Sequence, residues 1–286
     1  MTNTYVFNPE DAAEMARLID LDRAITKGMD GPLTGLPTLP ETAQVLDIAC
    51  GPGGWVLDVA FDNPDMEVAG IDISKTMIDY ANARARTQRL PNASFGVMNI
   101  LEPLDFSDNS FDLVNARFLV AVLQREAWPK VVHECYRVTR PGGTIRLTEI
   151  DSMGQTSSPA YSELNYKTYQ AGKILGYGFS PDGRSLGVTH MLGKFLQDLG
   201  CQNIQNKMHV IDFSTDSEAW PDIFHNYEIA FKTLQPFILK ANVATQEELD
   251  RLYQQFLIEI YSSNFRGVWP YMSVWGTKPL IPENEK

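Results

Sequence analysis

The segment from Val45 to Trp55 constrains the fold more than any other part of this sequence. It reads Val-Leu-Asp-Ile-Ala-Cys-Gly-Pro-Gly-Gly-Trp, a short apolar run that leads into a glycine-rich turn. Residues 45–49 are expected to form a buried strand and residues 53–63 a helix. Glycines let a ligand approach the backbone closely, and the first amides of the helix present partial positive charge to a ligand anion. The segment therefore predicts a strand, a turn and a helix that can hold a nucleoside ligand.

Strands and helices alternate after this segment, which predicts a mostly parallel sheet. Further strands are expected at 67–73, 94–98, 111–116 and 144–150, and helices at 75–89 and 128–138. Beyond residue 150 the pattern predicts helices at 161–175, 189–199 and 216–264, the last broken near Pro236, and strands at 206–213 and 271–275. A helix over 9–30 comes first, with Asn8 as its cap and Pro9 in its first turn.

Charge and cysteine content exclude several classes of protein. The 286 residues carry a formal net charge of −12, and the only basic cluster is Arg84, Arg86 and Arg89 on an expected helix. Nucleic-acid binding requires a basic track, so none is expected here. The three cysteines are far apart, which favours a reducing cytoplasm. No apolar run is long enough to cross a membrane, and no membrane association is expected.

Asp72 narrows the kind of ligand, because it ends the strand after the glycine-rich turn. An acidic residue in this place accepts hydrogen bonds from ribose hydroxyls in nucleotide-binding sheets. The dinucleotide pattern G-x-G-x-x-G fails, since Val56 stands where its third glycine is required. Pro52 also removes an amide that a pyrophosphate could use. We therefore expect a nucleoside ligand whose anion is weaker, such as an amino-acid carboxylate.

These residues resemble the class I S-adenosylmethionine-dependent methyltransferases. Val45–Trp55 is similar to the first motif of that family, with Ala49 in the place of its first glycine, and Gly70–Ser74 is similar to the second. Met98-Asn99-Ile100 resembles the third motif, with Asn99 where an aspartate is usual. The resemblance implies S-adenosylmethionine as cofactor, bound by Asp47, Ala49, Gly51, Gly53, Asp72, Ile73, Met77, Asn99, Ile100, Ala116 and Arg117.

The resemblance also implies the architecture. We expect an α/β, Rossmann-like sheet of seven strands, mostly parallel with the last strand antiparallel, and helices on both faces. Residues 1–41 would form an N-terminal helical lid segment and residues 42–280 the methyltransferase domain. Helical insertions at about 151–185 and 214–267 would complete the lid, and residues 281–286 form a tail. The unmatched segments are where the acceptor pocket is expected.

Candidates for catalysis are few. His225 lies in the helical insertion beside Tyr227, and His190 opens a helix next to a glycine-rich loop. Tyr5 precedes the first helix, where a lid would carry it over the cofactor. Glu149 and Asp151 end the fifth strand, where either a substrate contact or a loop cap would explain them. No Cys or His spacing indicates zinc, and no carboxylate cluster indicates magnesium, so no metal is expected.

The sequence thus predicts methyl transfer from S-adenosylmethionine to a small organic acceptor, in the manner of secondary metabolism or of quinone-like compounds. Transfer to oxygen, nitrogen or carbon is left open, as is the oligomeric state, a homo-oligomer included. The alternative is a protein that binds S-adenosylmethionine without transferring its methyl group, as a cofactor-assisted cyclase or a regulatory module. An oxidoreductase that uses a dinucleotide is disfavoured by Val56.

Overall fold

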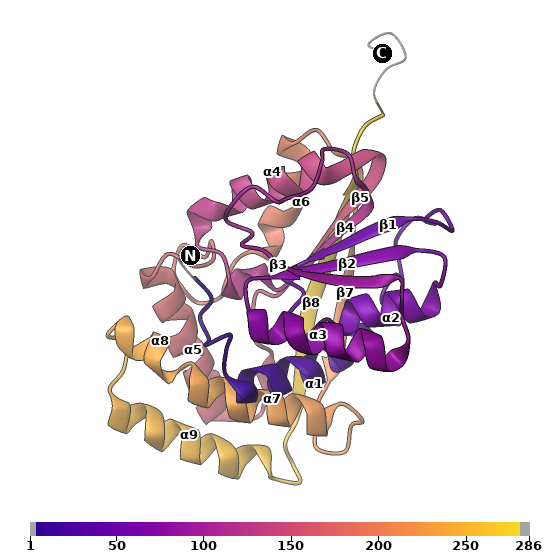
Figure 1. The fold of residues 1–286 in the computed structure, drawn as a ribbon. Helices are drawn as coiled ribbons and strands as arrows, with labels where there is room; N and C mark the ends of the chain where they lie inside the picture. Colours follow the sequence, from indigo (N-terminus) through magenta and orange to yellow (C-terminus); the bar gives the residue numbers. More distant parts are fainter. Residues whose placement is uncertain (1–3, 281–286) are drawn as a thin grey trace.

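A single eight-stranded sheet organises the chain, and helices cover both of its faces (Figure 1). The computed structural model describes residues 4–280. The strands are β1 (Gln44–Ile48), β2 (Glu67–Asp72), β3 (Ala93–Val97), β4 (Phe111–Arg117), β5 (Thr139–Glu149), β6 (Gln155–Thr156), β7 (Gln202–Asp212) and β8 (Gly267–Thr277). This architecture confirms the expected Rossmann-like class.

Five parallel strands form one part of the sheet, in the order β3-β2-β1-β4-β5. The central strand β1 pairs on both edges, since Val45 pairs with Val68 of β2 and with Leu113 of β4. Its apolar side chains are buried because helices cover both faces of the sheet. The β5 strand begins at Thr139, earlier than expected, and its pairing with β4 shifts register between Phe111 and Leu113. A local irregularity thus accommodates the Pro-Gly-Gly turn within the strand.

The remaining strands run antiparallel to β8, which itself lies antiparallel to β5. The expected last antiparallel strand is therefore present, although it extends from Gly267 instead of residue 271. The two-residue β6 was not expected and brings the strand number to eight. The two residues of β6 are polar, so the sequence alone does not distinguish this strand from a loop.

Helices α1 (Ala12–Gly28), α2 (Gly54–Asp62) and α3 (Lys75–Gln88) lie on one side of the sheet, and α4 (Trp128–Val138) and α6 (Thr189–Asp198) on the other (Figure 1). Two short 3-10 helices, η1 (Leu119–Ala121) and η2 (Arg125–Ala127), follow β4. Asp11, and not Asn8, caps α1, since its Oδ1 accepts a hydrogen bond from Ala13 N at 2.9 Å. Pro9 lies before the helix and not in its first turn.

Four further helices form a cap beside the sheet: α5 (Pro159–Ile174), α7 (Trp220–Thr233), α8 (Gln235–Lys240) and α9 (Gln246–Ile260). Within the cap, α5 packs against α8 and α9. Helix α1, outside the cap, packs against α7. The single break expected near Pro236 is replaced by two, because Pro236 lies in the first turn of α8 and α9 begins only after Thr245. Rings of Tyr161, Tyr227 and Phe231 meet at centroid distances of 4.9–5.6 Å and form the cap's core.

Between residues 4 and 280, no helix is both long enough and apolar enough to cross a membrane.

The turn between β1 and α2 places three residues in the left-handed backbone region. Gly51 and Gly53 have φ of 54° and 78°, and Ala49 has φ of 52°. The glycines adopt this conformation without steric cost, whereas a Cβ in this region costs roughly 1–2 kcal/mol. Ala49 therefore stores strain in the turn.

We predict that Ala49→Gly leaves the free energy of unfolding unchanged or raises it by up to about 1 kcal/mol, because relief of strain outweighs the added chain entropy of glycine. Urea denaturation measures this. The matched control is Ala83→Gly at an exposed position of α3, which should lower the free energy of unfolding by about 1 kcal/mol. Equal losses in the two variants would contradict the assignment of strain to Ala49.

Candidate functional site

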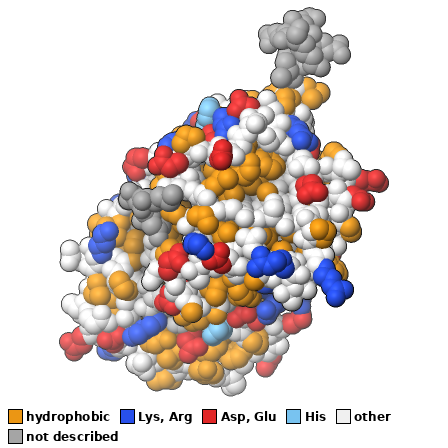
Figure 2. Space-filling view, in the orientation of Figure 1, with side chains coloured by type: hydrophobic (Ala, Val, Ile, Leu, Met, Phe, Trp, Pro, Cys, Tyr) orange, Lys and Arg blue, Asp and Glu red, His pale blue; other side chains and the backbone are white. Residues whose placement is uncertain are grey.

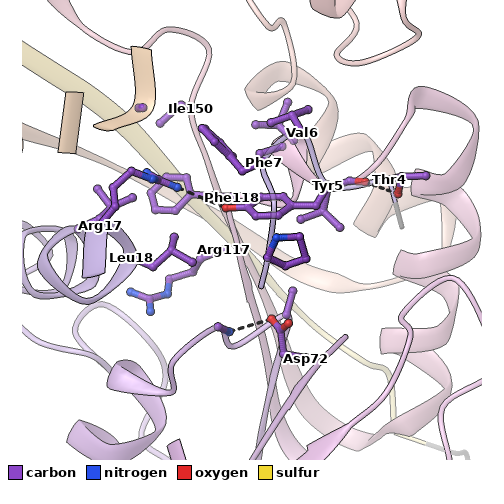
Figure 3. A pocket seen from close by; sticks show the side chains of 18 of the residues that line it. Thr4, Tyr5, Val6, Phe7, Arg17, Leu18, Asp72, Arg117, Phe118 and Ile150 are labelled. Carbon is purple, nitrogen blue, oxygen red and sulfur yellow. Dashed lines mark hydrogen bonds between the residues drawn. The ribbon is translucent and has the colours of Figure 1, made fainter. Parts of the chain in front are cut away.

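A cavity opens at the carboxyl ends of β1 and β4 and extends under the cap (Figure 3). Two groups of residues line it. The first, which we call the cofactor lobe, comes from the ends of β1, β2, β3 and β4, the loops after the first three, and the facing side of α1. The second, the acceptor lobe, comes from η1, the loop after β5, α5, α7, α8 and β8. The cavity thus lies where the strand order reverses, the usual ligand site in such sheets.

Asp72 joins the two loops that bound the cofactor lobe. Its Oδ2 accepts a hydrogen bond from Gly51 N at 2.9 Å, and its Oδ1 accepts one from Ser74 N at 2.9 Å (Figure 3). Burial raises the pKa of Asp72, while these backbone donors oppose the rise. Each carboxylate oxygen keeps a second lone pair for a hydroxyl group. The residue can therefore hold a ribose while it holds the loop.

Nine of the residues that the sequence assigned to the cofactor line the cavity: Asp47, Ala49, Gly51, Asp72, Ile73, Met77, Asn99, Ile100 and Arg117. Gly53 and Ala116 do not. A Cβ at Gly53 would come within 2.5 Å of the Phe95 ring, so this glycine serves the close packing of the turn. Ala116 is fully buried inside the sheet.

Met77, Asn99 and Ile100 form the far wall of the cofactor lobe. Asn99 Oδ1 accepts a hydrogen bond from Leu101 N at 3.1 Å, which orients the amide, and its second lone pair remains for an amino group. Met77 and Ile100 are buried apolar side chains that can pack against a flat ring. This combination of an oriented acceptor and apolar faces suits an adenine base.

The opposite end of the cofactor lobe carries balanced charges. Burial raises the pKa of Asp47 to about 6, although Arg117 and a hydrogen bond from Asn115 oppose the rise. Arg117 forms an ion pair with Asp22 of α1, and its Nη1 donates to Thr26 Oγ1 at 3.2 Å. Asp22 also lies against the first turn of α2, because a Cβ at Gly54 would come within 1.9 Å of its Oδ2. An arginine and two carboxylates thus surround one end of the cavity.

A buried polar cluster occupies the boundary of the two lobes (Figure 3). Arg17 donates to Glu14 through Nε at 2.7 Å and Nη2 at 2.6 Å, and its Nη1 donates to Asn226 Oδ1 at 2.7 Å. Tyr5 lines the cavity, and its hydroxyl donates to Glu14. Burial, together with the negative charge of Glu14, raises the pKa of Tyr5, so its phenol stays protonated.

Residues 4–9 cross the mouth of the cavity as a strap. Val6 N donates to Ala121 O at 3.0 Å, and Thr4 Oγ1 donates to Val122 O at 2.6 Å. The hydroxyl of Tyr177 donates to Thr4 O, and Ser74 Oγ donates to Pro9 O at 3.1 Å. The strap therefore touches η1, the loop after α5 and the start of α3. The strap in this way carries Tyr5 to the lining of the cavity.

The structure places the histidine candidates elsewhere. His225 does not line the cavity; its Nδ1 lies 3.1 Å from Asp20 Oδ2 on the outer side of α1, and its side chain is 46% exposed. His190 is exposed at the first turn of α6. Asp151 caps that helix, accepting from Val188 N at 2.6 Å and Thr189 N at 3.0 Å. These contacts give no support to a catalytic role.

Sequence reasoning missed the polar side of α1. Glu14 and Arg17 are 1% and 5% exposed, and Arg17 lines the cavity together with Asp22. A signal was available, since positions 14, 17, 18, 21 and 22 share one side of a helix.

Comparison with known proteins agrees with this geometry. Residues 45–143 match a family model described as a methyltransferase domain. An uncharacterized methyltransferase of Schizosaccharomyces pombe is 32% identical over 158 residues, 53% of this chain and 56% of that protein. The demethylmenaquinone methyltransferase of Lactococcus lactis is 32% identical over 131 residues, 46% of this chain and 48% of that protein. The chain therefore spans about half the length of these curated relatives.

The likeness in fold extends further. A geranyl diphosphate C-methyltransferase from Streptomyces coelicolor, solved with S-adenosyl-L-homocysteine, superposes with a TM-score of 0.51 at 14% identity, covering 95% of this chain and 87% of that one. Residues 45–143 are therefore similar to a methyltransferase domain, and the chain as a whole shares the fold of this structure.

We predict that Asp72→Asn weakens binding of S-adenosylhomocysteine about tenfold to a hundredfold, because hydrogen bonds to a charged acceptor are lost or weakened. Isothermal titration calorimetry measures this. Asp79→Asn on α3, whose carboxylate only pairs with exposed Lys75, is the matched control and should bind as the unmodified protein does. Unchanged affinity in Asp72→Asn would remove Asp72 from the ribose site.

Proposed function

We propose that this chain transfers the methyl group of S-adenosylmethionine to a small organic acceptor. The observation that carries the proposal is that one continuous cavity joins an adenosine-shaped lobe to a second, apolar lobe under the cap. A protein that only binds the nucleoside has no need of the second lobe. The relatives named for demethylmenaquinone and phosphoethanolamine methylation support a small acceptor.

In this proposal the nine lining residues given above hold the cofactor. Asp72 accepts from the ribose hydroxyls, Asn99 accepts from the adenine amino group, and Ile73 and Met77 pack on the base. Arg117 pairs with the carboxylate of the methionine portion, while Asp47 and Asp22 accept from its ammonium group. The pair of opposite charges at this end matches an amino-acid zwitterion.

S-adenosylmethionine supplies a sulfonium methyl group that is already activated. The protein's task is then to hold the acceptor atom in line with the sulfur–methyl bond, and orientation can lower a barrier by roughly 7–11 kcal/mol in the best cases. The strap and the cap enclose the junction of the two lobes and exclude water from it. No metal is required for such a transfer, and no group of metal-ligating side chains occurs among residues 4–280.

Tyr5 is the residue we propose for proton removal when the acceptor is a hydroxyl. Its oxygen can accept the acceptor's proton while its own proton passes to Glu14, to which it already donates. Arg17 holds Glu14 by two hydrogen bonds and thereby fixes the direction of the relay. Neither His225 nor His190 is needed for this step.

The surface and the thiols bear on partners and location. Figure 2 shows acidic and basic side chains interspersed on one face, without a continuous basic track, which favours a small acceptor over a nucleic acid. Cys50, Cys135 and Cys201 are free thiols, consistent with the reducing cytoplasm that we propose.

The experiment that tests the function is turnover of methyl-labelled S-adenosylmethionine with three kinds of acceptor: a small-metabolite extract, bulk tRNA and a denatured protein mixture. We expect S-adenosylhomocysteine to form only with the metabolite extract. Formation with tRNA or protein alone would overturn the small acceptor. Binding of S-adenosylmethionine without turnover in any mixture would favour the alternative, a cofactor-assisted cyclase or a regulatory module.

A further prediction concerns Asp22 of α1. Asp22→Asn should weaken binding of S-adenosylhomocysteine about tenfold or more, because an ammonium group loses a charged acceptor. Binding of methylthioadenosine, which lacks the amino-acid portion, should not change. Calorimetry with both ligands measures the difference, and Asp20→Asn, which faces His225 outside the cavity, is the matched control. Equal losses for both ligands would mean that Asp22 acts only on the structure.

A further inference from the structure

The acceptor lobe is lined by apolar and aromatic side chains. They come from the loops after β5 and α5, from three cap helices and from β8: Ile150, Met153, Tyr169, Leu186, Tyr227, Ala230, Leu234, Phe237 and Trp269. The strap adds Val6, and η1 adds Val120 and Ala121. Such a surface favours a ligand that buries hydrocarbon or an aromatic ring.

Four hydroxyl groups that line this lobe already have partners within the protein. The hydroxyl of Tyr227 donates to Met153 O, and that of Tyr169 accepts from Met153 N at 2.8 Å. Thr168 Oγ1 donates to Leu164 O at 2.9 Å, and the hydroxyl of Tyr177 donates to Thr4 O. These groups shape the lobe by holding its own backbone, and a charged ligand would have to compete with those bonds.

Formal charge is absent from the lobe apart from one neutralised pair at its boundary. Among residues 4–280, the charged side chains that line the cavity are Arg17, Asp22, Asp47, Asp72 and Arg117, and no lysine, histidine or glutamate does so. All but Arg17 belong to the cofactor lobe. The three guanidinium nitrogens of Arg17 are bonded to Glu14 and Asn226, so its charge is balanced before any acceptor arrives.

We infer that the acceptor is an uncharged, largely apolar molecule that contains a ring or a branched hydrocarbon. Burying a phosphate, a carboxylate or an ammonium group in this lobe would leave an ion without a counter-charge, which is strongly unfavourable. A neutral body of the same shape gains from contact with the aromatic walls. This inference rests on the proposed methyl transfer and names the class of acceptor for it.

Two small residues give the lobe its room. Gly172 of α5 lines the cavity, and a Cβ there would meet its nearest neighbour, Tyr177 Cβ, at 3.7 Å, so a side chain fits without displacing the backbone. Ala230 of α7 is a second small residue of the lining. Larger side chains at either position would fill the lobe and leave the cofactor lobe intact.

The test uses three ligands with one common body: para-octylphenol, which is neutral near pH 7, para-octylbenzoate, which is an anion, and para-octylbenzylamine, which is a cation. Binding to the unmodified protein with S-adenosylhomocysteine is followed by calorimetry and by the fluorescence of tryptophan, since Trp269 lines the lobe. We expect the phenol to bind at least about tenfold more tightly than either charged ligand. Equal or tighter binding of a charged ligand, or no binding of the phenol, overturns the inference.

Gly172→Leu should reduce para-octylphenol binding by about tenfold or more and leave S-adenosylhomocysteine binding unchanged. Gly193→Leu is the matched control, because Gly193 of α6 faces open space away from the cavity. If Gly172→Leu does not fold, as judged by thermal unfolding, Ala230→Leu replaces it. Unchanged phenol binding in the folded variant also overturns the inference, because the ligand then lies outside the lobe.

The same titrations separate this inference from the proposed function. If S-adenosylhomocysteine does not bind at all, the methyltransferase site itself is wrong. If it binds and the charged ligands are preferred, only the class of acceptor is wrong.

Discussion

The pairing of β1 with two neighbours determines where this protein can bind anything. Ile48 lies in register with Ile71 of β2 on one edge of β1 and with Ala116 of β4 on the other. The strands that follow β1 in sequence, β2 and β3, lie to one side of it, and β4 and β5 lie to the other. The connections must therefore diverge at the carboxyl end of β1, which leaves a crevice there. Ala49, Gly51 and Gly53 turn the chain at that crevice with left-handed conformations, and Ala49 and Gly51 line it.

Helix α1 forms one wall of the crevice with charged side chains, since Arg17 and Asp22 both line the cavity. A helix that faced the sheet with apolar residues alone would fill the cofactor lobe, whereas Asp22 reaches Arg117 across it and Glu14 holds Arg17 beside the acceptor lobe. Buried ions are tolerated only with partners, and here the partners come from different segments of the chain. The N-terminal helix, β4 and α7 are thus bound together through Arg117 and through the contact of Arg17 with Asn226.

The predictions from sequence succeeded where local pattern decides the outcome. The strands and helices between 44 and 138 follow from short apolar runs and turns, and Asp72 follows from its distance to the glycine-rich turn. What failed depends on tertiary contact. His225 lies two positions before Tyr227, but residues at that spacing on a helix point in different directions. The helix therefore turns Tyr227 to the cavity and His225 to Asp20. Asp22 could not be assigned, because its role depends on the Arg117 side chain 95 positions away.

The acceptor lobe owes its shape to a single loop. Tyr161 and Tyr227 both donate to Met153 O, and Tyr169 accepts from Met153 N, so the chain after β5 is bound to two cap helices at one residue. The cap therefore cannot tilt independently of the sheet end that carries Ile150. Because the cofactor residues lie on other strands, changes in the cap's inner side chains alter the acceptor lobe without disturbing Asp72 or Asn99. In the function that we propose, acceptor specificity and cofactor binding are in this way separable within one cavity.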